Sequence, residues 1–281
     1  MKRKRKAIPI IVLLAIVFIG VLIYFNNDKE KKFILEQRFI AHALGGIDGK
    51  KYTNSLEALN EGYDNGIKLF EVDLSMTSDN VMVARHDWDE FLYKQLEQEP
   101  KNDKYEPLTE EEFKSMRINN IYTPLTFEEL LMIMEEKKDL FIVLDTKSTT
   151  YDEIKVEYEY IVKKTKEINP KLLNRIIPQI YNRDMLTTIN EIYKFKNIFY
   201  TLYQDGINNE DLIEFINANK SVIAIIMHEG RYSEELIESL NGINVASYVH
   251  TINDVELGNK YFNSGVTGLY TDFLNDYNFI D

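Results

Sequence analysis

The strongest constraint on the fold is a regular alternation of short apolar runs with longer amphipathic segments after residue 38. Eight of the runs are rich in β-branched and aromatic residues and are apolar at consecutive positions, as expected of strands buried on both faces of a parallel sheet. The predicted strands are Phe39–Ala43, Leu69–Ser75, Leu140–Asp145, Ile176–Tyr181, Ile198–Tyr203, Val222–Met227, Val245–His250 and Gly268–Thr271. The segments between them predict helices, and the one beginning at Phe127 follows a capping-box pattern, Thr126 with Glu129.

Eight strands with interleaved helices and no second-domain boundary predict an α/β fold, a (β/α)8 TIM barrel over residues 39–281. The alternative is an open doubly wound sheet. That fold normally has a Gly-rich phosphate loop after the first strand, and His42-Ala43-Leu44-Gly45-Gly46 does not match one. Residues 88–124 interrupt the alternation of strands and helices with a long, charged and aromatic segment, which we expect at the rim of the barrel.

The N-terminus has the pattern of a membrane anchor. Five basic residues, 2–6, precede an uncharged apolar stretch, 7–25, that would span about 28 Å as a helix. We therefore predict a cytoplasmic basic tip and transmembrane anchor over residues 1–26 and a linker over 27–38. The catalytic domain would then be extracellular, on a single-pass protein of the cell membrane. A cleaved signal peptide is the alternative, although no small-residue cleavage pattern follows the stretch.

Composition excludes several classes of protein. The net charge is −13, and the basic residues at the extreme N-terminus leave the remainder still more acidic, which is unfavourable for binding nucleic acid. The chain has no cysteine, which excludes disulfide scaffolds, Cys-ligated zinc and thiol nucleophiles.

Acidic side chains mark the ends of two neighbouring predicted strands. Glu71 and Asp73 are two residues apart in a strand, so both carboxylates face the same way. Asp145 and Lys147 share a face in the same manner at the end of the next strand. Three inward carboxylates predict a site for one hard divalent cation, Mg²⁺, Ca²⁺ or Mn²⁺, and Lys147 could hold a phosphate oxygen. Ordinary ion pairs on a half-exposed strand are the alternative.

All four histidines lie at or near predicted strand ends, where a barrel keeps its active site. They are His42, His86, His228 and His250. Imidazoles titrate near neutral pH, so they are candidates for acid–base catalysis. A structural role remains the alternative for any one of them.

These motifs, taken in order, resemble the glycerophosphodiester phosphodiesterases and their relatives with phosphatidylinositol-phospholipase-C-like barrels. The resemblance spans roughly residues 39–275. The matching pieces are Ala41-His42, Asn54-Ser55-Leu56-Glu57-Ala58, Phe70-Glu71-Val72-Asp73-Leu74, Arg85-His86-Asp87, Pro124-Leu125-Thr126-Phe127, Leu144-Asp145-Thr146-Lys147, His250-Thr251-Ile252-Asn253-Asp254 and Gly265-Val266-Thr267-Gly268-Leu269-Tyr270-Thr271-Asp272.

Four positions depart from the family pattern. Ala43 replaces an Arg that binds phosphate, Thr53 replaces a Glu near the metal, Asp145 replaces a Glu ligand, and His250 replaces a common Trp. We expect Arg85, Lys147 or backbone N–H groups around Gly45 and Gly46 to supply the lost phosphate contact.

The resemblance implies a metal-dependent phosphodiesterase. In it, His42 takes a proton from the attacking hydroxyl, His86 gives one to the leaving oxygen, and Glu71, Asp73 and Asp145 hold the cation. The residues expected at the phosphate or the rest of the substrate are Lys147, Arg85, Asn54, Gln179, Tyr181, Tyr203, His228 and His250. The expected partners are a phosphodiester small molecule, a lipid head group or an envelope polymer, with the membrane bound through the N-terminal helix.

Three alternatives to this activity stay open. One is a phospholipase D-like lyase of the same superfamily, in which a substrate hydroxyl attacks through a cyclic phosphate. Another is an acidic glycoside hydrolase, which needs two carboxylates and no cation. The last is a non-catalytic surface binding protein that keeps the barrel, a reading that Ala43 supports.

Overall fold

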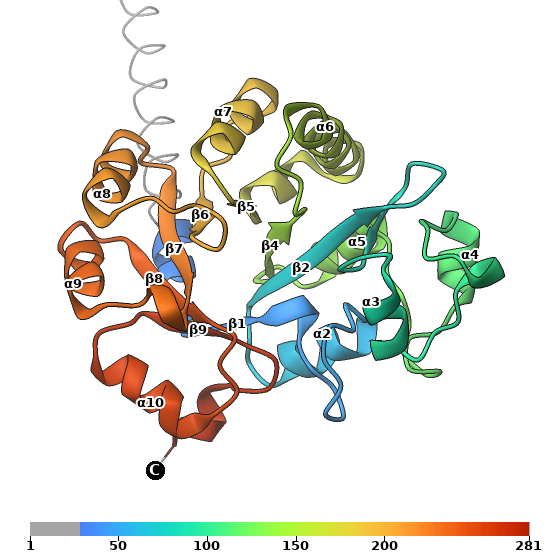
Figure 1. Cartoon of the computed structure of the whole chain (residues 1–281), viewed down its shortest axis with the longest axis horizontal. Helices are drawn as coiled ribbons and strands as arrows, with labels where there is room; N and C mark the ends of the chain where they lie inside the picture. Colours follow the sequence, from blue (N-terminus) through green and yellow to red (C-terminus); the bar gives the residue numbers. More distant parts are fainter. Residues whose placement is uncertain (1–28, 281) are drawn as a thin grey trace, which may run out of the picture.

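The structure, a computed structural model, describes residues 29–280 and shows eight parallel strands closed into a barrel (Figure 1). Strand β1 pairs with both β9 and β2, which closes the sheet. The barrel strands are β1 Phe39–Ala41, β2 Leu69–Met76, β4 Phe141–Asp145, β5 Ile176–Ile180, β6 Ile198–Thr201, β7 Val222–His228, β8 Ala246–His250 and β9 Gly268–Thr271. The predicted barrel is therefore confirmed, and the open sheet is excluded.

Helices surround the barrel and cover its strands (Figure 1). Most begin at a residue whose side chain accepts a hydrogen bond from the backbone of the first turn, among them Ser55, Asn182 and Ser233. The helices are α2 Leu56–Asp64, α3 Glu90–Gln95, α4 Glu110–Ser115, α5 Phe127–Glu136, α6 Tyr151–Ile168, α7 Arg183–Ile192, α8 Asn209–Ala218, α9 Glu234–Gly242 and α10 Val255–Asn263.

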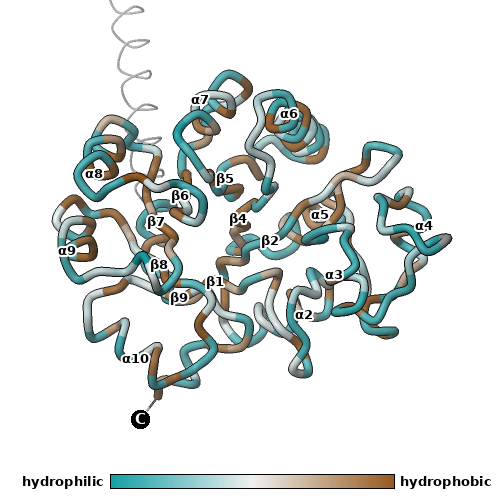
Figure 2. The backbone as a smooth tube through the Cα atoms, viewed as in Figure 1, coloured by the Kyte–Doolittle hydropathy of each residue, from teal (hydrophilic) through white to brown (hydrophobic). Residues whose placement is uncertain are grey.

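The alternation of side chains along each strand creates two separate cores. In β2, Phe70 and Val72 pack outward against the helices, whereas Leu69 belongs to the cluster inside the barrel. Figure 2 shows the resulting concentration of hydrophobic residues on the strands and on the inner sides of the helices. Glu71 and Asp73 continue the inward series begun by Leu69, so their carboxylates point into the mouth of the barrel.

Residues 29–35 form a helix that closes the N-terminal end of the barrel. Ile34 is fully buried in the interior cluster, and the Phe33 ring lies 5.3 Å from that of Phe141 at the start of β4. The described part of the predicted linker therefore packs against the barrel instead of hanging free from it.

The predicted localisation, as a single-pass protein of the cell membrane, is wrong for the part of the chain that the structure describes. Across residues 29–280 no helix is both long and apolar enough to cross a bilayer. The longest, α6, has 18 residues but carries charged side chains in almost every turn. The predicted anchor, residues 1–26, and the first two residues of the predicted linker lie outside the described residues.

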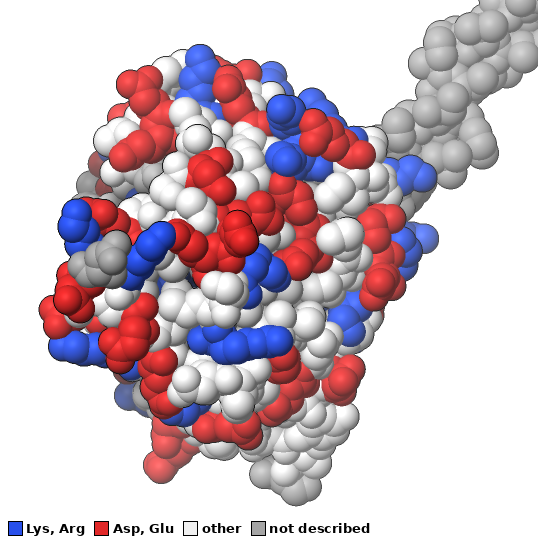
Figure 3. All heavy atoms as spheres, turned by 90° about the vertical axis from the view of Figure 1, so that its right-hand side faces the viewer, with Lys and Arg blue, Asp and Glu red and all other residues white. Residues whose placement is uncertain are grey.

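Residues 88–124 form the excursion that the sequence predicts beside the barrel mouth. It follows the short strand β3, Met82–Ala84, which pairs antiparallel with the end of β2. The excursion contains α3, which the sequence did not reveal, and α4. It has its own small core, in which Trp88, Tyr93 and Phe113 are buried. Figure 3 shows this side of the molecule, where acidic and basic side chains are interspersed.

Candidate active site

Three buried carboxylates meet at the C-terminal ends of β2 and β4. In the parallel register Asp73 is the partner of Asp145, and Glu71 lies one inward position below Asp73. One oxygen from each of Glu71, Asp73 and Asp145 lies within 4.8 Å of the other two. The three acids that the sequence predicted to share one face of the sheet therefore lie together in the structure.

Lys147 connects two of these acids. Its Nζ donates to Asp73 Oδ1 at 2.5 Å and to Asp145 Oδ2 at 2.8 Å. Burial acts to lower the pKa of Lys147, but the charges of Asp145 and Asp73 outweigh it and raise that pKa well above its usual value. Burial likewise works against ionisation of Asp73, but the ammonium of Lys147 holds the pKa of this carboxyl well below its usual range. Both groups are therefore charged at neutral pH.

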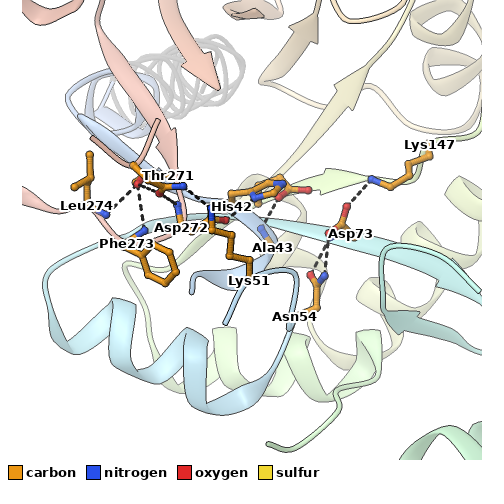
Figure 4. Close-up of polar contacts among 12 residues, drawn as sticks. His42, Ala43, Lys51, Asn54, Asp73, Lys147, Thr271, Asp272, Phe273 and Leu274 are labelled. Carbon is orange, nitrogen blue, oxygen red and sulfur yellow. Dashed lines mark hydrogen bonds and ion pairs between the residues drawn. The ribbon is translucent and has the colours of Figure 1, made fainter. Parts of the chain in front are cut away.

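The third acid, Glu71, is held differently. The backbone N–H of Ala43 donates to Glu71 Oε2 at 2.7 Å (Figure 4). The other oxygen of Glu71, Oε1, is buried and has no hydrogen-bond partner. Burial and the nearby charge of Asp73 raise the pKa of Glu71 to about 8. A buried carboxylate oxygen without a partner is costly, so the site as built favours an additional positive group beside Glu71.

Asn54, predicted to bind substrate, is committed to Asp73. Its Nδ2 donates to Asp73 Oδ2 at 2.9 Å, and its Oδ1 accepts from the Asp73 backbone N–H at 3.1 Å (Figure 4). The side chain is fully buried and does not line the pocket. Asn54 therefore orients a carboxylate, and the prediction that it contacts substrate needs correction.

His42 pairs with an acid that the prediction of site residues omitted. Nδ1 of His42 lies 2.8 Å from Oδ1 of Asp272, which follows β9, and Lys51 and Asn253 contact the other carboxylate oxygen (Figure 4). Burial acts to lower the pKa of His42, but the Asp272 hydrogen bond and the charge of Glu71 outweigh it and raise that pKa to about 9. The carboxylate fixes the proton on Nδ1 and leaves Nε2 for chemistry.

His86 lies across the pocket from His42, with Tyr52 between them. The Tyr52 ring contacts both imidazoles edge-on, with centroids 5.0 Å from His42 and 5.5 Å from His86. Burial lowers the pKa of His86, and the opposing charge of Asp73 only partly compensates. His86 is therefore neutral at a pH where His42 is protonated.

These groups line a pocket of about 390 Å³ at the mouth of the barrel. Five of the predicted phosphate and substrate contacts line it, namely Lys147, Gln179, Tyr181, Tyr203 and His250. The Tyr181 hydroxyl donates to Asp145 Oδ1 at 2.6 Å, and the Tyr270 hydroxyl donates to Gln179 Oε1 at 2.8 Å. Burial lowers the pKa of His250 to about 4, and its Nε2 is buried without a partner, so His250 is a neutral wall of the pocket.

Two other predicted contacts lie elsewhere. His228 is exposed at the end of β7 and lines a separate groove. The backbone N–H groups of Gly45 and Gly46, offered as phosphate donors, are already bonded to the carbonyls of His42 and Asp272 at 2.8 and 2.6 Å. Of the proposed replacements for the family Arg, Lys147 is the one that lines the pocket.

Arg85 points away from the pocket, into the core of the excursion. Its guanidinium lies 4.6 Å from each of the ring centroids of Trp88 and Tyr93 and donates to Gln98 Oε1 at 2.8 Å. The side chain is 2% exposed. The prediction that Arg85 binds phosphate is therefore not supported, because its hydrogen bonds and stacking anchor residues 88–98 beside the loop after β3 that carries His86.

We expect Arg85→Met to lower the free energy of unfolding by about 2–4 kcal/mol, because Gln98 Oε1 would lose a charged donor in a buried place. Urea denaturation measures this loss. Binding of sn-glycerol 3-phosphate to the folded variant should stay within about threefold of the wild type. Weaker binding of sn-glycerol 3-phosphate, with an unchanged free energy of unfolding, would instead show that Arg85 binds the phosphate.

Two site residues that the prediction omitted, Tyr270 and Asp272, follow a pattern that is visible in the sequence. Tyr270 and Asp272 are two apart at the end of the last strand, the same spacing that identified Glu71 and Asp73. Tyr270 belongs to the interior cluster, so the alternation carries Asp272 toward the mouth. Tyr52 had no comparable signal, because it lies in a loop with φ of +59°.

Comparison with known proteins agrees with this geometry. The sequence model of the "Glycerophosphoryl diester phosphodiesterase family" matches residues 46–276. None of the curated proteins matches the chain. The match to the family covers the three buried acids, His86 and Asp272, and begins just after His42.

Solved structures with the same fold include three enzymes of this kind. A glycerophosphodiester phosphodiesterase from Parabacteroides distasonis is 20% identical, with a TM-score of 0.66, and the match covers 84% of this chain and 92% of that one. A phosphodiesterase from Oleispira antarctica, in complex with the product sn-glycerol-3-phosphate, is 18% identical, with a TM-score of 0.65 and coverage of 84% and 92%. A glycerophosphodiester phosphodiesterase from Thermotoga maritima is 20% identical, with a TM-score of 0.62 and coverage of 83% and 93%.

The family match spans most of the chain, and the barrel, the acidic cluster and the paired histidines lie within or beside it. On these grounds the chain belongs to the glycerophosphoryl diester phosphodiesterase family and is a phosphoric diester hydrolase.

Proposed function

We propose that the chain hydrolyses glycerophosphodiesters or the related phosphodiester bonds of phospholipid head groups and envelope polymers. The observation that carries this proposal is the convergence of Glu71, Asp145, Lys147 and two imidazoles on one pocket of about 390 Å³. Asp73 lies directly beside it, with a carboxylate oxygen within 4.8 Å of those of Glu71 and Asp145. Similarity to a phosphodiesterase solved with sn-glycerol-3-phosphate supports a glycerol phosphate as the product.

Glu71, Asp73 and Asp145 fit one divalent cation. All three are buried, all are hard oxygen donors, and the Oε1 of Glu71 has no other partner. When bound, such a cation withdraws charge from the phosphoryl oxygens. Lys147, which borders the same carboxylates, would hold a non-bridging oxygen of the diester and so replace the family Arg lost at Ala43. Mg²⁺, Ca²⁺ and Mn²⁺ all suit such a set of oxygen ligands.

His42 and His86 would act as the acid–base pair. Their pKa values are opposite to what the predicted roles need. The pKa of His42, the predicted base, is raised to about 9, and the pKa of His86, the predicted acid, is lowered. A divalent cation beside Glu71 would offset the negative charge that raises His42, and the anionic diester would favour protonation of His86. Both changes move His42 toward a base and His86 toward an acid.

The water or hydroxyl that attacks would lose its proton to Nε2 of His42, whose other nitrogen is held by Asp272. His86 would protonate the leaving oxygen. Gln179, Tyr203 and His250, on the far wall of the pocket, would contact the organic part of the substrate. Attack by a substrate hydroxyl would instead give a cyclic phosphate, the lyase outcome.

The deciding experiment uses the full chain, stripped of metal with EDTA and then supplied with Mg²⁺, Mn²⁺ or Ca²⁺. We expect release of the alcohol from a glycerophosphodiester to fall at least tenfold with EDTA and to return with at least one ion. ³¹P NMR of the product separates a monoester, from hydrolysis, from a cyclic phosphate. No cleavage and no metal binding would favour the non-catalytic binding protein.

We expect Glu71→Gln to weaken binding of Mn²⁺ at least tenfold, because an amide oxygen replaces a charged ligand. Isothermal titration calorimetry measures the dissociation constant directly, without reference to turnover. Glu61→Gln is the matched control, since Glu61 is an exposed carboxylate on α2. Equal affinity in the two variants would remove Glu71 from the cation site.

A further inference from the structure

Tyr52 has a strained backbone at the centre of the active site. Its φ of +59° lies in the left-handed region, which glycine adopts freely and a bulky aromatic residue rarely does. Such a conformation costs free energy and persists only where the surrounding structure holds it. In this conformation the half-buried ring of Tyr52 lines the pocket and contacts His42 and His86 edge-on. The strain therefore places an aromatic side chain between the two predicted acid–base groups.

The ring of Tyr52 also packs against a small hydrophobic cluster outside the pocket. Its members are Ile47, Ala58, Leu92, Leu96, Ile118 and Tyr122. Two further contacts hold the loop of residues 47–52: the Tyr122 hydroxyl donates to Asp48 Oδ2 at 2.7 Å, and Lys50 pairs with Glu97. Tyr52 is therefore fixed before any substrate arrives, as a preorganised hydrogen-bond donor must be.

The hydroxyl of Tyr52 is available to a ligand. It has no hydrogen-bond partner among the described residues, whereas the two buried tyrosines of the pocket, Tyr181 and Tyr270, already donate to side chains. The charges that act on it belong to the site itself: Asp272, Asp73, Lys147 and Glu71. Burial, followed by the carboxylates among them, raises the pKa of Tyr52 above its ordinary value. The hydroxyl therefore keeps its proton at neutral pH and can donate a hydrogen bond to an anion.

A bound phosphodiester has two non-bridging oxygens, and the pocket offers few donors to hold them. Of the described residues that line the pocket, Lys147 is the one lysine or arginine. An ammonium has three N–H groups, and Lys147 already gives two of them to Asp73 and Asp145. The backbone N–H of Ala43 is likewise occupied, by Glu71. These groups leave one hydrogen bond for the diester, so a second donor is needed to hold both oxygens.

We propose that the Tyr52 hydroxyl donates a hydrogen bond to a non-bridging oxygen of the diester. The inference rests on the proposed function and assigns a further residue to the reaction. With His42 at the attacking group and His86 at the leaving oxygen, the two imidazoles flank the phosphorus along the line of displacement. Tyr52 contacts both rings and so lies beside that line, where the non-bridging oxygens carry the charge of the transition state.

Tyr52→Phe removes the hydroxyl and keeps the ring that contacts the imidazoles and the hydrophobic cluster. We expect kcat/KM for glycerophosphoethanol to fall about 10- to 100-fold, the range for one hydrogen-bond donor to a charged oxygen. Tyr122→Phe is the matched control, because it frees Asp48 and loosens the same loop without removing a group from the pocket. It should stay within about threefold of the wild type. An equal loss in both variants would show that Tyr52 only supports the loop.

Two further measurements separate a phosphate contact from an effect on the histidines. The p-nitrophenyl ester of glycerol 3-phosphate has the same non-bridging oxygens, so Tyr52→Phe should lose the same factor in kcat/KM on it. The dissociation constant of sn-glycerol 3-phosphate, from isothermal titration calorimetry, should rise at least fivefold in Tyr52→Phe and stay unchanged in Tyr122→Phe.

The inference alone would be overturned by an unchanged dissociation constant in Tyr52→Phe, or by unchanged kcat/KM for glycerophosphoethanol. A loss that disappears with the p-nitrophenyl ester would also overturn it, because Tyr52 would then act through His86. Failure of the wild type to cleave any diester would overturn the proposed function, whereas the dissociation constants of sn-glycerol 3-phosphate would still decide whether Tyr52 contacts the phosphate.

Discussion

His86→Ala is expected to lower kcat for glycerophosphoethanol by about 10³, the usual contribution of a positioned general acid. The loss should be much smaller, about tenfold or less, for the p-nitrophenyl ester of glycerol 3-phosphate. Nitrophenolate is a stable anion at neutral pH and leaves without a proton, whereas an alkoxide does not. Steady-state kinetics on this pair of substrates therefore isolates proton donation from every other effect of the substitution.

The same pair of substrates separates the two histidines. His42→Ala should reduce kcat for both esters by a similar factor, because removal of a proton from the attacking group is needed whatever leaves. If kcat of the His86 variant falls by the same factor for both esters, His86 is not the general acid. If His42→Ala were the variant rescued by the nitrophenyl ester, the two roles would be exchanged.

Asp272→Asn is expected to reduce kcat by about 10²–10³ and to lower the pKa of His42 from about 9. The carboxylate accepts the Nδ1 proton of His42 at 2.8 Å, whereas an amide can donate to that nitrogen and favour the other tautomer. Nε2 would then carry the proton and could not accept another. Loss of the negative charge also disfavours the imidazolium, which gives the downward sign of the shift.

NMR titration of the His42 ring in the metal-free protein measures this shift independently of turnover. Asp276→Asn is the matched control, because Asp276 is an exposed carboxylate four residues further on that pairs with Arg38. It should change neither kcat nor the His42 titration. An unchanged pKa of His42 in Asp272→Asn would contradict the assigned role of the Asp272 carboxylate.

The sequence predicted the barrel well because each buried strand has its own local signal. All eight barrel strands were found, and Gly268–Thr271 has the predicted bounds. Helix α3 was missed, since its six residues are too few to show an amphipathic period. The site acids were predictable because the two-residue period of a strand fixes the face on which Glu71 and Asp73 lie.

Side-chain direction outside the strands was not predictable. Arg85 precedes His86 and was expected to face the phosphate, but the fold turns it into a pocket between Trp88 and Tyr93. Asn54 lies in a loop with φ of +45°, and its bonds to Asp73 depend on contacts between distant segments. Neither placement has a signature in the neighbouring residues, because tertiary contacts alone decide it.

The pairing of β1 with β9 has a consequence for how the enzyme is made. His42 and Asp272 are separated by 230 residues, and the carboxylate arrives only with the last strand of the barrel. The three acids lie on β2 and β4, within residues 69–145, so they leave the ribosome well before β9 does. The chain cannot orient its histidine until β9 has been synthesised and docked. With the roles proposed for His42 and Asp272, catalytic activity is therefore a late event in biogenesis, and a chain that ends before β9 would have the three acids without the carboxylate that orients His42.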